Sequence, residues 1–299
     1  MLENMVKKQT EKQERMLESW QEKHDRENPF PEDVRLTADV DYVGDGKPCH
    51  RIDIYRPEES REKLPVLIDI HGGGFLLGKK EVNRLFCADM CKRGFVVFCI
   101  EYPLAPKADI FDIFRDLTAG IDRACELAEK YGGDASRLYL CGDSAGAYLC
   151  VYLAAIQNSA QMAKAAGTGP VRCRIGALGL QSGMFYTRRP DKIGLFLPNM
   201  IYGKGWRRRG FCRYTDPEVP ELTQSLPPCF LVTAKGDFLR CYSRRFASAL
   251  ARNGAKHRLL DMEAGKKLPH AFAAMLPETP EAQRANAEMA EFLKANGQL

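Results

Sequence analysis

The 299-residue sequence has no apolar run long enough to cross a bilayer, and its first twenty residues are crowded with Lys, Glu and Gln. A membrane-spanning helix needs about 20 mostly apolar residues, and a secretory signal needs an apolar h-region, so we expect neither and place the protein in the cytoplasm. The net charge is only +5, and the Lys and Arg are scattered. This pattern argues against a nucleic-acid partner.

Histidine is scarce, with five in the chain, whereas cysteine is common, with eleven. Several cysteines, such as Cys99 and Cys150, sit inside apolar segments, which predicts reduced, buried thiols instead of a disulfide framework. Cys87 and Cys91 have the i, i+4 spacing of one helical face, but neither a histidine nor a second cysteine pair accompanies them. The local pattern therefore predicts no zinc site, and we expect no metal and no cofactor.

Short apolar runs alternate with segments of helical periodicity, which predicts an α/β protein with a mostly parallel sheet and helices on both faces. The central runs are almost continuously apolar, as strands buried on both faces should be. The expected strands cover residues 36–42, 50–55, 65–70, 95–102, 137–141, 175–180, 229–234 and 257–262.

Helices are expected between these strands, and two regions do not fit the repeat. Residues 110–128 carry one apolar stripe, residues 147–156 are apolar on every side, and a proline follows the candidate N-cap Thr279. We interpret the chain, 1–299, as a single domain with cap or lid elements formed by about 1–30 and 183–225. The second insertion would lie above the carboxyl ends of the strands, where α/β enzymes bind ligands.

Two glycine-rich motifs follow strand-like runs and indicate the chemistry. Residues 142–146, Gly-Asp-Ser-Ala-Gly, have the form G-x-S-x-G, which places Ser144 on a sharp strand-to-helix turn. Residues 71–74, His-Gly-Gly-Gly, offer backbone N–H groups that can approach a developing negative charge. The amides of Gly73, Gly74 and Ala145 are therefore the expected oxyanion hole. The two motifs together predict serine-based acyl transfer.

A serine nucleophile needs a base and an orienting acid, which in this fold follow it in the chain. His270 is the only histidine expected on a loop between the last strand and the last helix, so we assign it as the base. Asp237, at the end of the strand 229–234, is the expected acid, although a carboxylate there also serves as a helix cap. Asp261 and Glu263 are the alternatives.

These motifs resemble those of the hormone-sensitive-lipase-like branch of the α/β-hydrolase fold, which includes many carboxylesterases. The resemblance extends from about residue 50 to the C-terminus. It rests on residues 71–75 (His-Gly-Gly-Gly-Phe), 101–106 (Glu-Tyr-Pro-Leu-Ala-Pro), 134–137 (Asp-Ala-Ser-Arg), 142–146, 226–228 (Leu-Pro-Pro) and the pair 236–237 (Gly-Asp). It implies an α/β-hydrolase fold with an eight-stranded sheet and a helical cap, and a cofactor-free hydrolase of esters with short- to medium-chain acyl groups.

Some positions depart from the family pattern without removing a catalytic group. They are Pro103, where the family often has Arg; Lys107, often acidic; Ala147, usually Gly; Arg240, commonly acidic; and Ala271, usually Gly. These departures bear on the substrate more than on the reaction.

The insertion is rich in aromatic and apolar residues, which either line a substrate pocket or attach the cap to the main domain. The expected pocket residues are Phe75, Met184, Phe185, Phe196 and Tyr202. The arginines at 188–189 and 207–209 are either solvated surface or a reader of a substrate carboxylate.

The leading functional interpretation is a serine carboxylesterase that acts on a small ester through an acyl-enzyme. Two alternatives stay open. One is an amidase, peptidase or deacetylase with the same triad, and the other is a binding protein that kept the fold and lost catalysis. A homodimer is also compatible with the sequence.

Overall fold

The computed structural model describes residues 2–60, 62–189, 192–263 and 268–297, and for residues 2–8 and 192–196 it describes the backbone only. Its centre is one eight-stranded sheet in the order β1-β2-β4-β3-β5-β6-β7-β8. The strands are β1 (Val34–Asp41), β2 (Arg51–Pro57), β3 (Leu64–Ile70), β4 (Val96–Ile100), β5 (Gly133–Asp143), β6 (Ile175–Gln181), β7 (Cys229–Ala234) and β8 (His257–Met262). From β4 to β8 all neighbours are parallel, whereas β2 pairs antiparallel with both β1 and β4. The predicted mostly parallel sheet is confirmed.

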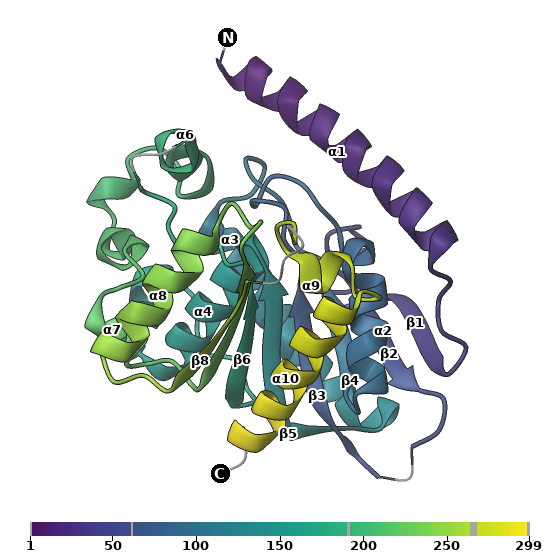
Figure 1. Ribbon diagram of the computed structural model, residues 1–299. Helices are drawn as coiled ribbons and strands as arrows, with labels where there is room; N and C mark the ends of the chain where they lie inside the picture. The colour runs from purple at the N-terminus through teal and green to yellow at the C-terminus, as the bar shows by residue number, and fades with distance from the viewer. Residues whose placement is uncertain (1, 61, 190–191, 264–267, 298–299) are drawn as a thin grey trace.

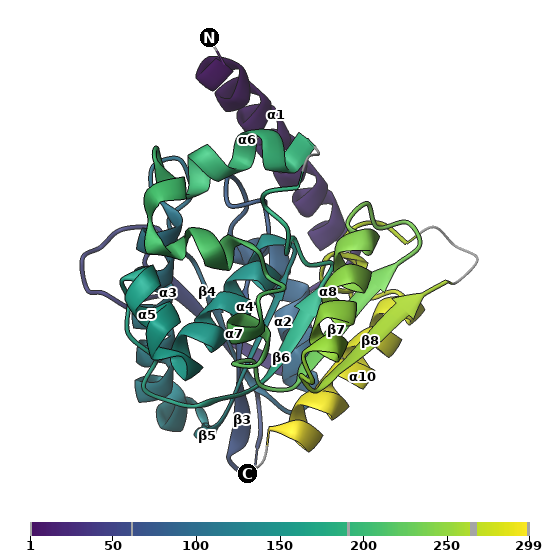
Figure 2. The ribbon, with the colours of Figure 1, turned by 90° about the vertical axis from the view of Figure 1, so that its left-hand side faces the viewer.

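Helices cover both faces of this sheet (Figures 1 and 2). They are α1 (Leu2–Glu27), α2 (Arg84–Lys92), α3 (Ile110–Ala128), α4 (Ala145–Asn158), α5 (Ala160–Ala166), α6 (Lys192–Ile201), α7 (Pro220–Thr223), α8 (Arg240–Arg252), α9 (Phe272–Met275) and α10 (Pro280–Asn296). Short 3-10 turns are η1 (Lys80–Asn83), η2 (Glu129–Tyr131), η3 (Trp206–Arg208) and η4 (Gly210–Thr215).

Strand periodicity divides the core into two layers. Side chains at alternate positions of a strand point to opposite faces. In β5, Leu140 packs in the layer that contains α3, α4 and α8, whereas Cys141 packs in the layer that contains α2, α9 and α10. The twelve residues from Ala145 to Ile156 in α4 are all buried, as its unbroken apolar sequence predicts.

The ends of two helices show the sequence signals of capping. Asp109 caps α3 with its carboxylate and forms a reciprocal capping box with Asp112. Thr279 accepts the amide of Ala282 at the start of α10, next to Pro280. At both helix starts, the capping residues are of types that mark an N-terminus in the sequence itself.

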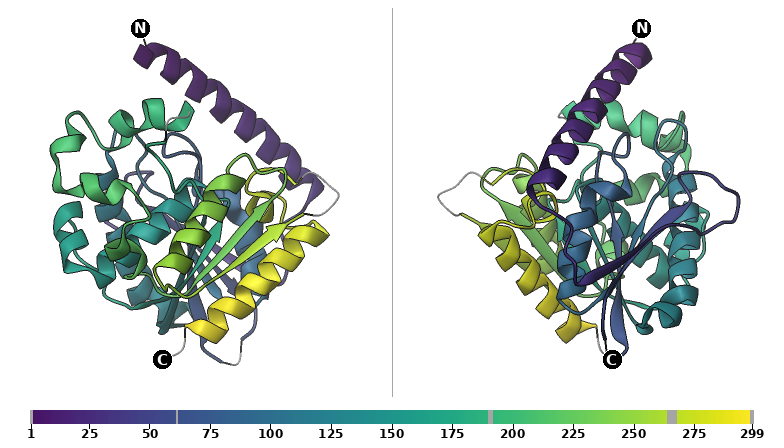
Figure 3. Two further views of the ribbon diagram at one scale, coloured as in Figure 1. Left: turned by 60° about the vertical axis from the view of Figure 1, so that its left-hand side comes forward. Right: turned by 90° about the vertical axis from the view of Figure 1, so that its right-hand side faces the viewer.

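Helix α1 is one continuous helix attached to the body near its C-terminal end. Gln21 donates to the Glu81 carbonyl, Arg84 pairs with Asp25 at 3.2 Å, and a ring nitrogen of His24 lies 3.1 Å from a carboxylate oxygen of Glu278. The views in Figure 3 show α1 extending from these contacts past the body of the domain. Helices α1 and α6 both lie at the end of the molecule opposite the C-terminus (Figures 1 and 2).

The eleven cysteines are all free, and six of them are buried. Among the described residues, no helix is both long enough and apolar enough to pass through a bilayer. The grouping of 1–30 and 183–225 into a cap stays a prediction.

Candidate active site

The turn between β5 and α4 carries Ser144 in a conformation that few residues adopt. Its φ is 51° and its ψ is −111°, in the region that is strained for a side chain with a Cβ. A Cβ added to Gly146 would meet the main-chain oxygen of Ile70 at 1.8 Å, and one at Gly142 would meet the same oxygen at 2.6 Å. The two glycines of the motif therefore allow α4 and β5 to pack directly against the end of β3.

The glycine loop that follows β3 is fixed to the residue before the serine. The amide of Gly72 donates to Oδ1 of Asp143 at 2.9 Å. Gly73 has a φ of +111°, and a Cβ there would lie 1.8 Å from the Leu77 oxygen; Gly74 has a φ of +63°. Because only glycine accepts these positions at low cost, the main chain of the loop turns tightly beside the serine.

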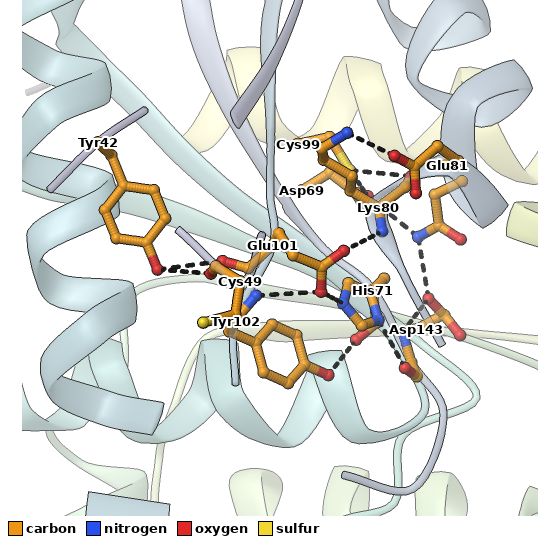
Figure 4. Close-up of polar contacts among 12 residues, drawn as sticks. Tyr42, Cys49, Asp69, His71, Lys80, Glu81, Cys99, Glu101, Tyr102 and Asp143 are labelled. Carbon is orange, nitrogen blue, oxygen red and sulfur yellow. Dashed lines mark hydrogen bonds and ion pairs between the residues drawn. The ribbon is translucent and has the colours of Figure 1, made fainter. Parts of the chain in front are cut away.

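The side chain of His71 holds this loop in place through hydrogen bonds from both of its ring nitrogens. Its Nδ1 lies 2.8 Å from the Gly72 carbonyl oxygen, which can only accept, and its Nε2 lies 3.0 Å from Oε1 of Glu101 (Figure 4). Both ring nitrogens therefore donate, and the ring is an imidazolium facing a carboxylate. Burial alone lowers the pKa of His71, but the charge and hydrogen bond of Glu101 outweigh it and raise that pKa. Tyr102 stacks on the ring at 4.3 Å.

Glu101 is itself held by three donors. Besides His71, its carboxylate accepts the amides of Lys80 at 3.0 Å and Tyr102 at 3.2 Å. Burial raises the pKa of Glu101, but the charge of His71 and these hydrogen bonds lower it overall. The Lys80 ammonium is 3% exposed and lies 2.9 Å from oxygens of both Asp39 and Asp53. The loop thus rests on a buried ionic network that reaches the edge of the sheet.

The predicted base and acid are in direct contact. Nδ1 of His270 lies 2.7 Å from Oδ1 of Asp237, which follows β7 as expected. Asp237 also accepts the Thr233 hydroxyl at 2.8 Å and the Leu239 amide at 2.9 Å. Burial raises the pKa of Asp237, but the hydrogen bond and charge of His270, with these other donors, lower it overall. On the other side, the Ser182 hydroxyl accepts the amide that follows His270 at 3.0 Å.

The alternative acids have other partners. Arg240 donates to Asp261 at 2.8 Å and to Glu263 at 2.6 Å, and Arg244 pairs with Asp261 at 2.8 Å. The arginine at position 240, a departure from the family pattern, thus joins α8 to the end of β8. Of the three carboxylates considered, Asp237 is the one in contact with His270.

Ser144 and His270 open on the same cavity of about 530 Å³. It is lined by Gln13, Leu17, His71, Gly72, Gly73, Gly74, Leu76, Leu77, Gly78, Val82, Asn83, Asp143, Ser144, Met184, Leu197, Met200, Phe238, His270, Ala271 and Met275. Away from the serine its walls are mostly aliphatic, and α1 and α6 supply part of them. An apolar cavity with a few convergent polar groups is typical of small-molecule sites.

The expected pocket residues divide into two groups. Met184 lines the cavity, whereas Phe75, Phe185 and Tyr202 are buried in the core instead. Phe75 packs edge-on against Tyr148, and Phe185 stacks on Phe246. Aromatic composition alone does not separate a ring that fills the core from one that faces a cavity. The side chain of Phe196, in α6, lies outside the described residues.

Several lining residues were missed from the sequence. Leu17 belongs to a helix of charged composition, and Leu197 lies in the insertion without a distinguishing motif. Met200 also lines the cavity, and it is one of the apolar residues of the insertion that the sequence offers either for the pocket or for attaching the cap. Phe238 had a usable signal, because it directly follows the predicted acid. Its ring centre lies 4.3 Å from that of His270, and it is 67% exposed.

Several arginines of the insertion lie on aromatic rings. The guanidinium groups of Arg188 and Arg207 lie 5.0 and 4.6 Å from the centre of the Trp206 ring, and Arg209 lies 4.9 Å from that of Phe111. Such contacts are favourable cation–π interactions. None of these three arginines lines the cavity in the described part of the chain.

The sheet is mostly parallel and eight-stranded, with a serine on the turn after β5 and an Asp–His pair from the loops after β7 and β8. This is the architecture of the α/β-hydrolase fold. Comparison with known proteins agrees. A family model described as BD-FAE matches residues 52–172. Esterase B from Lactobacillus rhamnosis HN001 superposes with a TM-score of 0.90 at 23% identity, covering 99% of this chain and 96% of that one. The chain has the α/β-hydrolase fold, and its resemblance to carboxylesterases of that fold is confirmed.

Relatives by sequence include esterases and a formamidase. The probable isoprenylcysteine alpha-carbonyl methylesterase of Oryza sativa subsp. japonica is 29% identical over 226 residues, or 72% of this chain and 54% of the relative. The kynurenine formamidase of Danio rerio is 31% identical over 99 residues, or 33% of this chain and 32% of the relative. The chain therefore spans about half the length of the methylesterase and a third of the formamidase.

Proposed function

We propose that this protein is a serine carboxylesterase that hydrolyses small esters with short- to medium-chain acyl groups, with Ser144, His270 and Asp237 as its catalytic triad. The observation that carries the proposal is that Ser144 opens on the same apolar cavity as His270, beside a glycine loop, and that His270 is hydrogen-bonded to the buried Asp237. The methylesterase relative, and an esterase B structure inhibited by a tributyrin phosphonate, support ester hydrolysis.

Acylation begins with attack of the Ser144 hydroxyl on the ester carbonyl carbon. Nε2 of His270 takes the hydroxyl proton, while Nδ1–H donates to Asp237 and so fixes the tautomer that leaves Nε2 free to accept. The carboxylate stabilises the imidazolium that forms. His270 then gives the proton to the departing alkoxide, and the acyl group stays on the serine.

Negative charge develops on the carbonyl oxygen during attack, and backbone amides are placed to stabilise it. The amide of Gly72 is already bonded to Asp143, which leaves those of Gly73 and Gly74, together with that of Ala145 at the start of α4, as the donors of the oxyanion hole. Losing one such donor typically costs about 3 kcal/mol of barrier. The imidazolium of His71 keeps the loop in this conformation and places a positive charge beneath it.

Hydrolysis of the acyl-serine completes the cycle. His270 accepts a proton from water, the hydroxide attacks the acyl carbon, and the same amides stabilise the second tetrahedral intermediate. The bond from the acyl carbon to Oγ of Ser144 then breaks, His270 returns the proton to that oxygen, and the carboxylic acid is released. All of these steps are acid–base and nucleophilic, so the triad and amides account for them without a cofactor.

The substrate class follows from the cavity. Its aliphatic walls, from Leu17 of α1 to Leu197 and Met200 of α6, favour an acyl chain over a charged group, and a volume of about 530 Å³ suits a small ester. We assign α1 and the 183–225 insertion as the cap that closes this cavity. A cytoplasmic location and a homodimer stay predictions.

Replacement of the nucleophile tests the proposal. Ser144→Ala should lower kcat on a p-nitrophenyl ester by several orders of magnitude, about 10⁴-fold or more, without changing the thermal unfolding midpoint by more than a few degrees. Ser248→Ala, on the exposed side of α8, is the matched control and should retain full activity. Retained turnover in Ser144→Ala, or failure of the native chain to react with a fluorophosphonate at Ser144, would refute the assignment.

Amide hydrolysis is the second candidate, because the formamidase relative shares part of the chain. An amine is a poorer leaving group than an alcohol, so this reaction depends more strongly on protonation by His270. Esters and anilides with the same acyl group, compared across increasing acyl length, separate the two. A larger kcat/KM for the anilides would replace the esterase assignment with an amidase, peptidase or deacetylase.

A further inference from the structure

Buried sulfur and oxygen atoms from β3, β4 and α2 lie close together near the glycine loop. Asp69, at the end of β3, is completely buried, and its Oδ2 lies 3.3 Å from Sγ of Cys99 in β4 and 3.6 Å from Sγ of Cys87 in α2. The potential ligand atoms of these three residues all lie within 4.8 Å of one another. Figure 4 shows Asp69 and Cys99 beside Lys80, at the edge of the His71 network.

We propose that Asp69, Cys87 and Cys99 form a structural binding site for a thiophilic divalent cation, with Zn²⁺ as the natural candidate. In a tetrahedral zinc site, Zn–S bonds of about 2.3 Å and Zn–O bonds of about 2.0 Å place sulfur and oxygen roughly 3.5 Å apart. The two observed Sγ–Oδ2 distances lie on either side of that value. The ligands would therefore need little rearrangement to bind the ion.

The charge of the cluster also fits a divalent ion. Without metal, one carboxylate and two thiols carry a formal charge of −1. Binding of Zn²⁺ to the carboxylate and two thiolates also gives −1, and the two thiol protons are released to solvent. The change therefore adds no net charge to the buried region, where an uncompensated charge is costly.

The main-chain carbonyl of Lys80 can supply the fourth ligand. Its oxygen lies 3.4 Å from Sγ of Cys99 and carries no charge, so it would close the site without changing the charge balance. Structural zinc sites are closed in this way.

The local sequence pattern predicts no such site, because it pairs Cys87 with Cys91. The fold instead brings Cys87 together with residues 18 positions before it and 12 after it, on two other elements. A bound ion would join β3, β4 and α2. The ion would also be connected to the active site by Asn83, because the side-chain amide of Asn83 donates at 3.0 Å to both Asp69 and Asp143.

Zinc content tests the proposal independently of esterase activity. The full chain, expressed in zinc-supplemented medium and dialysed against EDTA while folded, should retain about one zinc per chain by elemental analysis. Cys87→Ala should reduce that content at least about tenfold. Cys229→Ala, which removes another fully buried thiol from the opposite layer of the core, is the matched control and should leave the content unchanged.

X-ray absorption at the zinc edge keeps the test decisive if a variant folds poorly. The native chain should show sulfur neighbours at about 2.3 Å and an oxygen neighbour at about 2.0 Å. Native protein without bound zinc, a coordination shell without sulfur, or the same zinc content in Cys87→Ala as in the native chain would each overturn the proposal.

Discussion

The imidazolium of His71 offers a specific test of how the glycine loop is held. Glu101→Gln keeps the shape of the side chain and removes its charge. Glutamine has one acceptor oxygen where the carboxylate has two, so it cannot receive all three donors that Glu101 accepts, from His71, Lys80 and Tyr102. His71 would then lose the charge that raises its pKa, and burial would favour the neutral ring.

The magnitude follows from the bonds that are lost or weakened. A hydrogen bond that involves a charged group contributes about 1.5–3 kcal/mol, and a neutral one about 1 kcal/mol. Loss of the charged contact and of one amide partner should therefore destabilise the fold by about 3 kcal/mol. If misalignment of the loop amides also removes about 1.4 kcal/mol of transition-state stabilisation, kcat falls about tenfold.

The pH dependence has a definite sign. Because the pKa of His71 is raised, its contribution to stability is complete below its usual value of 6.5 and is lost as the pH rises through the raised value. Because the pKa of Glu101 is lowered, its contribution is complete above its usual value of 4.5 and is lost as the pH falls through the lowered value. The stability difference between the native chain and Glu101→Gln should therefore be greatest between pH 4.5 and 6.5.

Chemical denaturation at a series of pH values, together with kcat on one ester, measures these effects. Glu263→Gln is the matched control, because it removes an exposed carboxylate with one arginine partner and should change stability by less than about 1 kcal/mol. A Glu101→Gln variant as stable as this control at every pH, or a difference that increases steadily from pH 6.5 to 9, would refute the account of His71 as a buried imidazolium.

Three further changes test other parts of the site. Gly146→Ala would place a Cβ 1.8 Å from a main-chain oxygen of β3, so the unfolding free energy should fall by about 3 kcal/mol, whereas Gly169→Ala, with open space around it, should have little effect in the same denaturation assay. Thr233→Val removes a donor to Asp237 and should raise the pKa of that carboxyl, so the acid limb of a kcat/KM–pH profile should shift upward; an unshifted limb would contradict this role. Leu17→Ala enlarges the cavity from the α1 side and should raise relative kcat/KM for longer acyl esters; an unchanged chain-length profile would exclude α1 from the substrate pocket.

Much of the sheet could be predicted, because buried parallel strands leave an unambiguous pattern. The strands at 229–234 and 257–262 match β7 and β8 at both ends. The strand at 137–141 was too short, since β5 begins at Gly133, in a polar segment that carries no apolar signal. Gly133 and Asp134 pair with Leu64 and Pro65 of β3 through the main chain, so this part of the strand needs no apolar side chains and hydrophobic periodicity does not reveal it.

The catalytic residues could be predicted from the sequence more completely than the residues that line the cavity. The expected contact between Asp237 and His270 is present, because a strict chain order and a small number of histidines left few choices. The cavity wall has no comparable constraint. Leu17 and Phe185 are both apolar residues in helix- or loop-like segments, yet the first lines the cavity and the second is in the core. That distinction depends on how distant segments pack, which local pattern does not contain.

Contact between main-chain atoms at Gly142 and Gly146 has a consequence for how this scaffold tolerates change. Because α4 and β3 touch through their backbones, the side chains of the surrounding apolar layers do not set the separation between these two elements, and polar contacts of Asp143 and His71 hold the glycine loop beside the serine. Substitutions in the surrounding apolar layers can then alter thermal resistance while the reacting groups keep their spacing. The residues that line the cavity can therefore vary while the reacting groups keep their positions, which suits a fold that serves many different substrates.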